Sequence, residues 1–247
     1  LEIKLPNTLD TQFYVKDFGP GLSHEQVMRL YTTYFDSTKQ DSNDFIGGFG
    51  VGSKSPFAYT DSFTVESRQD GKKRIYSAYV DEQQVPQIAY MGETETDEPN
   101  GLTVGFPVKP NDFAKFIQEA KDVLKWFDIK PLLKGTPETI PDLEVIKISN
   151  TLSIPKHSAY TAMIKLGNVA YPLQKDASEL HDELSEEKIR WLLNRKAIIE
   201  VPIGTIAVAA SREALSYDKT TIKELKNVLA REASACASHV IKELTDI

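Results

Sequence analysis

The chain of 247 residues is long enough for one large or two modest domains, and with 40% hydrophobic and 26% charged residues its composition is that of an ordinary globular protein. A formal net charge of -7 argues against passive binding to duplex nucleic acid and indicates no specific nucleic-acid partner. Because Cys236 is the only cysteine, a disulfide framework and a cysteine-based zinc site are excluded.

The first elements lead from a strand into a long loop. Residues 11–16 alternate in character and predict a strand that runs into the turn-forming DFGPG segment. Ser23 and Gln26 have the spacing of a capping box, and apolar residues at helical spacing follow them to about residue 35. Residues 36–52 lack usable periodicity and predict a long loop that opens a short helix around SKSPFAY.

The next elements predict a mostly antiparallel sheet. Asp70 and Gly71 are typical of a tight hairpin between two strands. Strand patterns cover 61–67, 73–80, 87–92 and 101–108, and an amphipathic helix covers 110–127.

A stretch rich in proline marks the expected domain boundary. Residues 128–143 hold three prolines and a glycine, DIKPLLKGTPETIPDL, so we expect a first domain at 1–127, a linker at 128–143 and a second domain at 144–247. The second domain is predicted to contain strands at 144–149, 160–173 and 197–210 and helices at 185–195 and from residue 219. Trp126 and Trp191, each on an apolar helical face, are expected in the core.

Three familiar signatures fail on spacing. The DFG of protein kinases needs an upstream catalytic loop and lysine strand, whereas only 16 residues precede Asp17. A Walker motif requires lysine directly after its last glycine, but Ser53 stands between Gly52 and Lys54. The glycines of GFGVG also lack the last step of the Rossmann pattern. We therefore expect neither a kinase domain nor a P-loop.

The two glycine-containing segments nevertheless suit a nucleotide. A glycine-rich loop that opens a helix presents backbone N–H groups to an anion, and an aspartate after a strand can accept a hydrogen bond from an exocyclic amine. Taken singly, these segments are also typical of a loop glycine cluster and of an Asx-turn.

Their order, a strand, DFGPG, an amphipathic helix, a long loop and GGFGVGSKSPF, resembles the GHKL ATPases, which include gyrase B, MutL, the ninety-kilodalton heat-shock chaperones and sensor histidine kinases. The resemblance implies an α+β protein: a truncated GHKL (Bergerat-type) α/β sandwich with a mostly antiparallel sheet, followed by a ribosomal-S5-like transducer domain. It implies ATP and magnesium as cofactors and a dimer that closes like a clamp. It assigns the adenine amino group to Asp17. The implied nucleotide-binding residues are Asp17, Gly19, Gly21, Leu22, Gly48, Phe49, Gly50, Val51, Gly52 and Ser53.

A second segment, VPIGTIAVAASREALSYD, resembles the middle-domain catalytic loop of the same chaperones. The resemblance implies that Arg212 reaches the terminal phosphate of ATP, where a guanidinium stabilises developing negative charge. The alternative is an ordinary ion pair of Arg212 with Glu213 or another neighbour.

The run YFDSTKQDSNDFIGGFGVGSKSPFAYTDSF together with SREALSYD resembles the rIIA proteins of T-even-like bacteriophages. Membership would imply a phage protein of the host bacterial cytoplasm, peripheral at most to the inner membrane, with an rIIB partner and a role in lysis inhibition and escape from exclusion.

Two departures from the GHKL pattern limit the expected chemistry. The family carries its general base and its magnesium ligand on a helix of the form ExxxN, and none precedes Leu1, so we expect a fragment that hydrolyses ATP little although the intact protein hydrolyses it. Leu102 follows Gly101 where the family has threonine, and strand alternation should turn Thr103 to the opposite face. A nucleotide sensor or scaffold without catalysis, and a DNA clamp like that of MutL or gyrase, remain alternatives.

Overall fold

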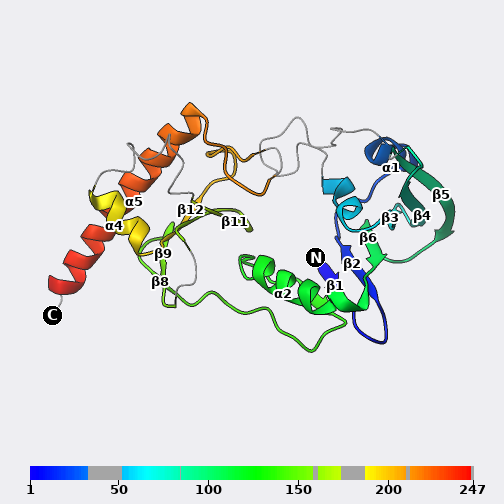
Figure 1. The fold of residues 1–247 in the computed structure, drawn as a ribbon, viewed down its shortest axis with the longest axis horizontal. Coiled ribbons are helices and arrows are strands. Elements are labelled where there is room, and N and C mark those ends of the chain that lie inside the picture. Colours follow the sequence, from blue (N-terminus) through cyan, green and yellow to red (C-terminus); the bar gives the residue numbers. More distant parts are fainter. Residues whose placement is uncertain (33–51, 84, 158–160, 174–186, 210–211, 246–247) are drawn as a thin grey trace. The chain divides into compact units, whose positions relative to one another are not determined.

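The structure is a computed structural model that describes residues 1–32, 52–83, 85–157, 161–173, 187–209 and 212–245. The chain divides into two compact units, each built on its own sheet (Figure 1). Unit 1 consists of Leu1–Leu124 and Ile129–Ile140, and unit 2 of Lys125–Asp128 and Pro141–Ile247.

Unit 1 is built on a mostly antiparallel sheet. Within the described residues it has seven strands in the order β5-β4-β3-β6-β2-β1-β7, of which only β1 and β7 pair in parallel. The strands are β1 Glu2–Lys4, β2 Gln12–Lys16, β3 Ser62–Gln69, β4 Lys72–Val80, β5 Pro86–Glu95, β6 Gly101–Pro107 and β7 Leu132–Lys134. The helical segments are α1 His24–Thr32, the 3-10 turns η1 Gly52–Ala58 and η2 Pro110–Asp112, and α2 Phe113–Leu124.

Local sequence signals account for several of these elements. Ser23 Oγ accepts the Gln26 N–H at 3.2 Å, and Gln26 Oε1 accepts the Ser23 N–H at 2.8 Å, so the capping box that begins α1 is confirmed. Asp70 and Gly71 have positive φ values of 54° and 74°, the geometry that a two-residue hairpin between β3 and β4 requires.

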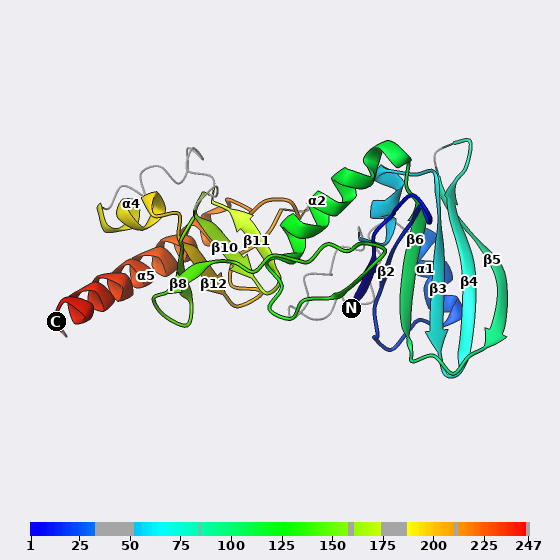
Figure 2. The same ribbon diagram turned by 90° about the horizontal axis from the view of Figure 1, so that it is seen from below.

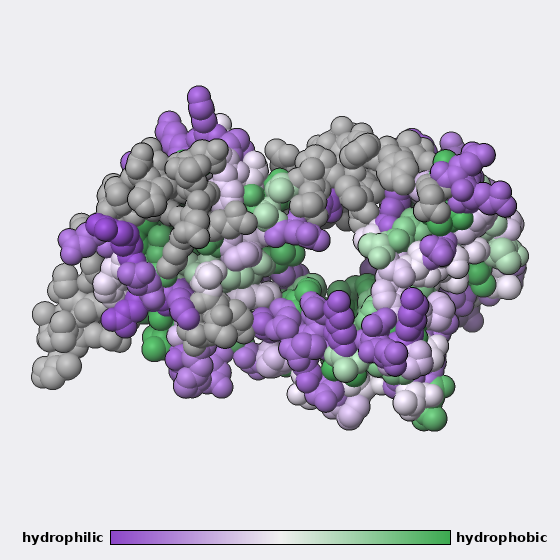
Figure 3. Space-filling view, viewed as in Figure 1, coloured by the Kyte–Doolittle hydropathy of each residue, from purple (hydrophilic) through white to green (hydrophobic). Residues whose placement is uncertain are grey.

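The sheet of unit 1 has one apolar and one charged face. On the apolar face α1, η1 and α2 cover an aromatic and aliphatic core that includes Tyr31, Phe63, Val65 and Phe106 (Figure 2). The solvent-exposed side of α2 carries hydrophilic side chains (Figure 3). The opposite face of the sheet carries ion pairs such as Lys16–Glu98 and Lys73–Glu66. Side chains that point to the apolar face are therefore the ones available to an apolar pocket.

The expected linker at 128–143 is only partly a connection. Leu132, Leu133 and Lys134 form β7, which pairs with Glu2, Ile3 and Lys4 of β1. Residues 129–140 therefore belong to unit 1, whereas 125–128 belong to unit 2. Prolines and a glycine are typical of an irregular path, but pairing with a strand distant in sequence is not visible in local composition.

Unit 2 has a smaller sheet. Within the described residues it has five strands in the order β11-β10-β12-β9-β8, and α4 and α5 pack on one of its faces. Trp126, Met163 and Ile198 form a small cluster apart from that core. The elements are β8 Val145–Lys147, β9 Leu152–Pro155, β10 Met163–Leu166, β11 Val169–Pro172, α4 Glu187–Asn194, β12 Ile198–Val201 and α5 Lys219–Thr245.

The two tryptophans differ in burial. Trp126 is 7% exposed, as expected of a core residue, but Trp191 is 42% exposed. The core prediction for Trp191 was wrong: the Arg195 guanidinium lies 5.1 Å from the centre of its ring, which gives the exposed indole a cationic neighbour. None of the helices in the described ranges combines the length and apolar character that crossing a bilayer requires.

Candidate functional site: a pocket beside Asp17

Asp17 follows β2 directly, and backbone groups hold its carboxylate in place. The N–H groups of Gly19 and Leu102 donate to Oδ1 at 2.9 and 3.1 Å, and the Asp17 N–H donates to the Leu102 carbonyl at 2.8 Å. Among the described residues, Oδ2 accepts no hydrogen bond. The carboxylate therefore has a fixed orientation and one oxygen left for a ligand.

Two glycines of the motifs are required by close backbone approach. Gly101 has a φ of 152°, and a Cβ there would lie 2.1 Å from the Asp17 carbonyl oxygen. Gly21 has a φ of 73°, and its Cβ would lie 2.1 Å from the Arg68 carbonyl oxygen. No side chain fits at either position, so both glycines hold the DFGPG turn against the sheet.

Ser67 fixes the same turn and was missed from the sequence. Its Oγ accepts the Leu22 N–H at 2.8 Å and donates to the Leu22 carbonyl at 2.7 Å. Ser67 is fully buried in β3, in alternation with Phe63 and Val65 on the apolar face. A serine in register with buried apolar residues was the available signal, because a buried hydroxyl needs a partner.

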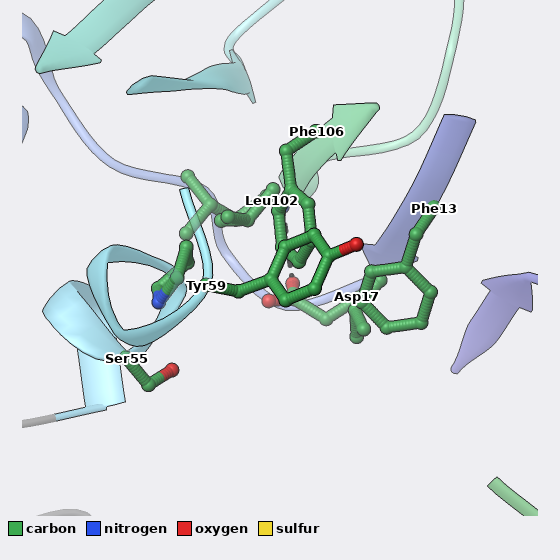
Figure 4. A pocket seen from close by; sticks show the side chains of 9 residues that line it. Phe13, Asp17, Ser55, Tyr59, Leu102 and Phe106 are labelled. Carbon is green, nitrogen blue, oxygen red and sulfur yellow. Dashed lines mark hydrogen bonds between the residues drawn. The ribbon is translucent and has the colours of Figure 1, made fainter. Parts of the chain in front are cut away.

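A pocket of about 380 Å³ opens beside Asp17 (Figure 4). Alternate residues of β2 and of β6 form one part of its wall, because alternate side chains of a strand share a face, and η1 forms the other. The lining residues are Phe13, Val15, Asp17, Ser55, Pro56, Tyr59, Leu102, Val104 and Phe106. Its size and its aromatic wall with few polar groups are typical of a small-molecule site.

Tyr59 is held at the pocket by two hydrogen bonds. Its hydroxyl donates to Asp112 Oδ2 at 2.6 Å and accepts the Lys109 N–H at 3.0 Å. Burial, together with the hydrogen bond to Asp112, raises the pKa of Tyr59. The ring is therefore a neutral wall of fixed position.

The predicted site residues fall into three groups. Asp17 lines the pocket, while Gly19, Gly21 and Leu22 shape the adjoining turn without lining it. Gly48, Phe49, Gly50 and Val51 lie outside the described residues. Gly52 and Ser53 begin η1, the short helix that the sequence predicted around SKSPFAY.

Lys54, the residue that stands near the lysine position of a P-loop, does not line the pocket. It is 7% exposed, and its Nζ donates to the Leu30 carbonyl in the last turn of α1 at 2.8 Å. A cation at the carboxyl end of a helix complements the helix dipole. This contact agrees with the failed Walker spacing.

Thr103 is turned away from the pocket, as strand alternation predicted. Its Oγ1 accepts a hydrogen bond from Arg68 Nη1 at 2.8 Å, and Arg68 lies buried with Glu66 and Glu98 each 3.9 Å away. Leu102, and not Thr103, therefore lines the pocket.

Arg212 belongs to unit 2 and lies in a hairpin. Val208 and Leu215 form an antiparallel bridge, and the Arg212 N–H donates to the Ala209 carbonyl at 2.8 Å. Arg212 has a φ of 63°, which is uncommon for a residue with a side chain. Burial raises the pKa of Tyr171, and the charge of Arg212 opposes that effect. The assignment of Arg212 to a phosphate stays a prediction.

The described residues do not fit a magnesium site. Within them, no group of three or more His, Cys, Asp or Glu side chains is placed to hold a metal ion. Asp17 alone brings a carboxylate to the pocket wall, whereas a magnesium site usually combines carboxylates with substrate phosphates.

Comparisons with known proteins bear on the fold. No family model matches the chain. Chaperone protein HtpG of Rhodococcus jostii is 29% identical over 173 residues, 58% of this chain and 26% of HtpG, so the chain spans about a quarter of that relative.

Two solved structures cover nearly the whole chain. The ATPase and transducer domains of DNA topoisomerase II from Balamuthia mandrillaris superpose with a TM-score of 0.56 at 13% identity, over 98% of this chain and 79% of that one. The ATPase region of Saccharomyces cerevisiae topoisomerase II gives 0.52 at 14% identity, over 100% and 80%. The predicted α+β class is confirmed, and the chain has the fold of the ATPase and transducer domains of topoisomerase II.

Proposed function

We propose that the chain binds an adenine nucleotide in the pocket beside Asp17 and is part of a GHKL-type protein whose conformation responds to ATP. The observation that carries this proposal is the orientation of the Asp17 carboxylate. Two backbone N–H groups hold Oδ1, which leaves Oδ2 to accept the amino group of adenine. The apolar and aromatic wall would contact the faces and edges of the base.

Calorimetric titration of the chain with ATP tests the proposal, with Asp17→Asn as the variant. The same N–H groups would hold the amide oxygen, so the amide NH2 would face the adenine amine and two donors would meet. We expect the affinity for ATP to fall roughly 10-fold or more.

Glu82→Gln is the matched control. Glu82 is an exposed acid that follows the carboxyl end of β4. The amino end of β4, at Lys73, is the end that lies level with Arg68 and Gly101, so Glu82 is at the opposite end of the strand. This variant should bind ATP like the unaltered chain. Absence of ATP binding at millimolar concentration, or equal affinity in Asp17→Asn, would contradict the proposal.

A nucleotide sensor without catalysis is a second candidate, and Leu102 is the residue that favours it. Leucine at this position removes a hydroxyl from the base-binding wall without closing the pocket. Phosphate release by the intact protein separates the two functions: a sensor binds ATP with no turnover above the rate of an Asp17→Asn variant, whereas an ATPase releases phosphate continuously.

We also propose a cellular role like that of the rIIA phage proteins, in the host cytoplasm or peripherally at its membrane. The resemblance of the run from Tyr34 to Phe63 and of SREALSYD supports it. Co-expression with an rIIB protein, followed by affinity purification, is the test. Recovery of a complex of fixed stoichiometry is expected, and its absence with and without ATP counts against this role.

A further inference from the structure

We infer that the pocket recognises its base through a single polar contact, the amino group on the Asp17 carboxylate, and does not read the ring nitrogen beside that amino group. The inference rests on the proposed nucleotide binding and concerns its specificity. Leu102 is the residue that decides it, because its side chain lines the pocket directly beside Asp17 (Figure 4).

Backbone contacts fix the place of residue 102. Its N–H donates to Asp17 Oδ1 at 3.1 Å and its carbonyl accepts the Asp17 N–H at 2.8 Å. A Cβ at Gly101 would lie 2.1 Å from the Asp17 carbonyl oxygen, so residue 101 cannot present a side chain there instead. The side chain next to the base-binding carboxylate is therefore that of residue 102, and leucine offers no hydrogen bond.

The neighbouring threonine cannot replace the missing hydroxyl. Thr103 pairs with Lys16 of β2 and with Glu66 of β3, and its hydroxyl is held on the far face of the sheet by Arg68 Nη1 at 2.8 Å. Bringing Thr103 to the pocket would require a one-residue slip of β6 between two partner strands, which would reverse the facing of every side chain in β6.

The rest of the described pocket wall adds little polarity near Asp17. The Tyr59 hydroxyl is engaged on both sides, with Asp112 and with the Lys109 N–H. Ser55 lies exposed on η1, and the other lining side chains are apolar. In this part of the wall the carboxylate is the group that distinguishes one base from another.

A single contact between Asp17 and the exocyclic amine predicts which purine bases the pocket distinguishes. Adenine and 1-deazaadenine both present an exocyclic amine to Oδ2, but 1-deazaadenine lacks the ring nitrogen N1. Hypoxanthine presents a carbonyl oxygen instead of the amine, which places two acceptors against each other. The pocket should accept the first two bases alike and reject the third.

The test compares ATP, 1-deaza-ATP and ITP by competition against a fluorescent ATP analogue on the unaltered chain. We expect the Kd of 1-deaza-ATP to lie within about 2-fold of that of ATP and the Kd of ITP to be roughly 10-fold higher or more, because a carboxylate facing an acceptor loses its hydrogen bond.

Leu102→Thr and Leu102→Val form a matched pair, since threonine and valine differ in one hydroxyl in place of a methyl group. Leu102→Thr should prefer ATP over 1-deaza-ATP by about 3- to 10-fold, the usual range for one hydrogen bond, and Leu102→Val should show no preference. Thr103→Val, on the other face, should leave the base selectivity of the chain unchanged.

The outcomes separate the inference from the proposed function. If no nucleotide binds the unaltered chain, the proposed function itself fails. If ATP binds but 1-deaza-ATP binds 10-fold more weakly, or ITP binds as well as ATP, nucleotide binding stands and the single-contact inference is overturned. Equal behaviour of Leu102→Thr and Leu102→Val would overturn the role of position 102.

Discussion

Two glycines with nearly the same φ allow the cost of backbone strain to be measured apart from the cost of a steric clash. Gly101 and Gly92 have φ values of 152° and 149°, but a Cβ at Gly92 meets nothing within 4 Å, whereas one at Gly101 would lie 2.1 Å from the Asp17 carbonyl oxygen. We expect Gly92→Ala to lower the free energy of unfolding by about 1 kcal/mol through backbone strain alone, and Gly101→Ala by about 3 kcal/mol or more. Urea denaturation of both variants measures this, and equal losses would contradict the close approach at Asp17.

Lys54 provides a second prediction for a single side chain. Its Nζ donates to the Leu30 carbonyl at 2.8 Å, so Lys54→Met should lower the free energy of unfolding by about 1.5–3 kcal/mol, the range for a hydrogen bond to a charged group. The variant should bind ATP within about 3-fold of the unaltered chain. Thermal unfolding and calorimetric titration report the two effects separately. A large loss of ATP affinity with unchanged stability would instead identify Lys54 as a phosphate ligand.

At the scale of elements, Asp218 caps the long helix α5. Its Oδ1 accepts the N–H groups of Thr220 and Thr221 at 2.9 and 3.0 Å, and its Oδ2 accepts the hydroxyls of Thr221 and Ser216 at 3.0 Å each. The hydrogen bonds from Thr221, followed by those of Ser216 and Thr220, lower the pKa of the Asp218 carboxyl group. Asp218→Ala should therefore lower the melting temperature of unit 2, and Asp218→Asn should lower it less, because asparagine is also a good cap.

The lowered pKa of Asp218 gives the cap a pH dependence of known sign. The charged cap stabilises the fold fully above the ordinary aspartate pKa of 3.8, and this contribution disappears as the pH falls through the lowered pKa. Melting curves from neutral pH into the acid range should show the chain and its Asp218→Asn variant converging. A difference that stays constant throughout would mean that the carboxylate charge plays no part in the cap.

Elements with local signals were predictable from the sequence, and those without them were not. Strand β2, the capping box of α1 and the Asp70–Gly71 hairpin depend on neighbouring residues and were predicted. Strands β7 and β9 have three and four residues and were missed. Segments this short carry too little pattern to predict a strand, and pairing with β1 and β8 is what makes them extended. For the site, strand alternation correctly predicted the facing of Leu102 and Thr103, whereas the nucleotide-binding role of Asp17 stays a prediction. Ser67 was missed because its role arises only when β3 lies beside the DFGPG turn.

At the scale of the whole molecule, the chain changes units three times, at 124/125, 128/129 and 140/141. Composition indicated an irregular stretch here, but the contacts of individual side chains decide which unit each part joins. Trp126 clusters with Met163 and Ile198 of unit 2, and the Lys165 ammonium lies 2.6 Å from Asp128, so 125–128 are anchored in that unit. Leu133 pairs with Ile3, which returns the chain to unit 1.

Trp126 and Trp191 form a natural pair for testing this anchor. Trp126→Ala removes a 7% exposed side chain from the cluster with Met163 and Ile198 and should lower the free energy of unfolding of unit 2 by about 3–5 kcal/mol. Trp191→Ala removes a 42% exposed ring and its contact with Arg195, so the loss should stay near 1 kcal/mol or less.

Hydrogen exchange followed by mass spectrometry locates the effect of each substitution. Trp126→Ala should speed exchange in β10 and β12, which carry Met163 and Ile198, while β3 and β6 keep their protection because their core residues lie in unit 1. Saturating ATP should add protection in β2 and β6 beside Asp17, since a ligand that binds the folded state raises its stability. If the Trp126 substitution speeds exchange more in β3 and β6 than in β10, the assignment of Trp126 to unit 2 is contradicted.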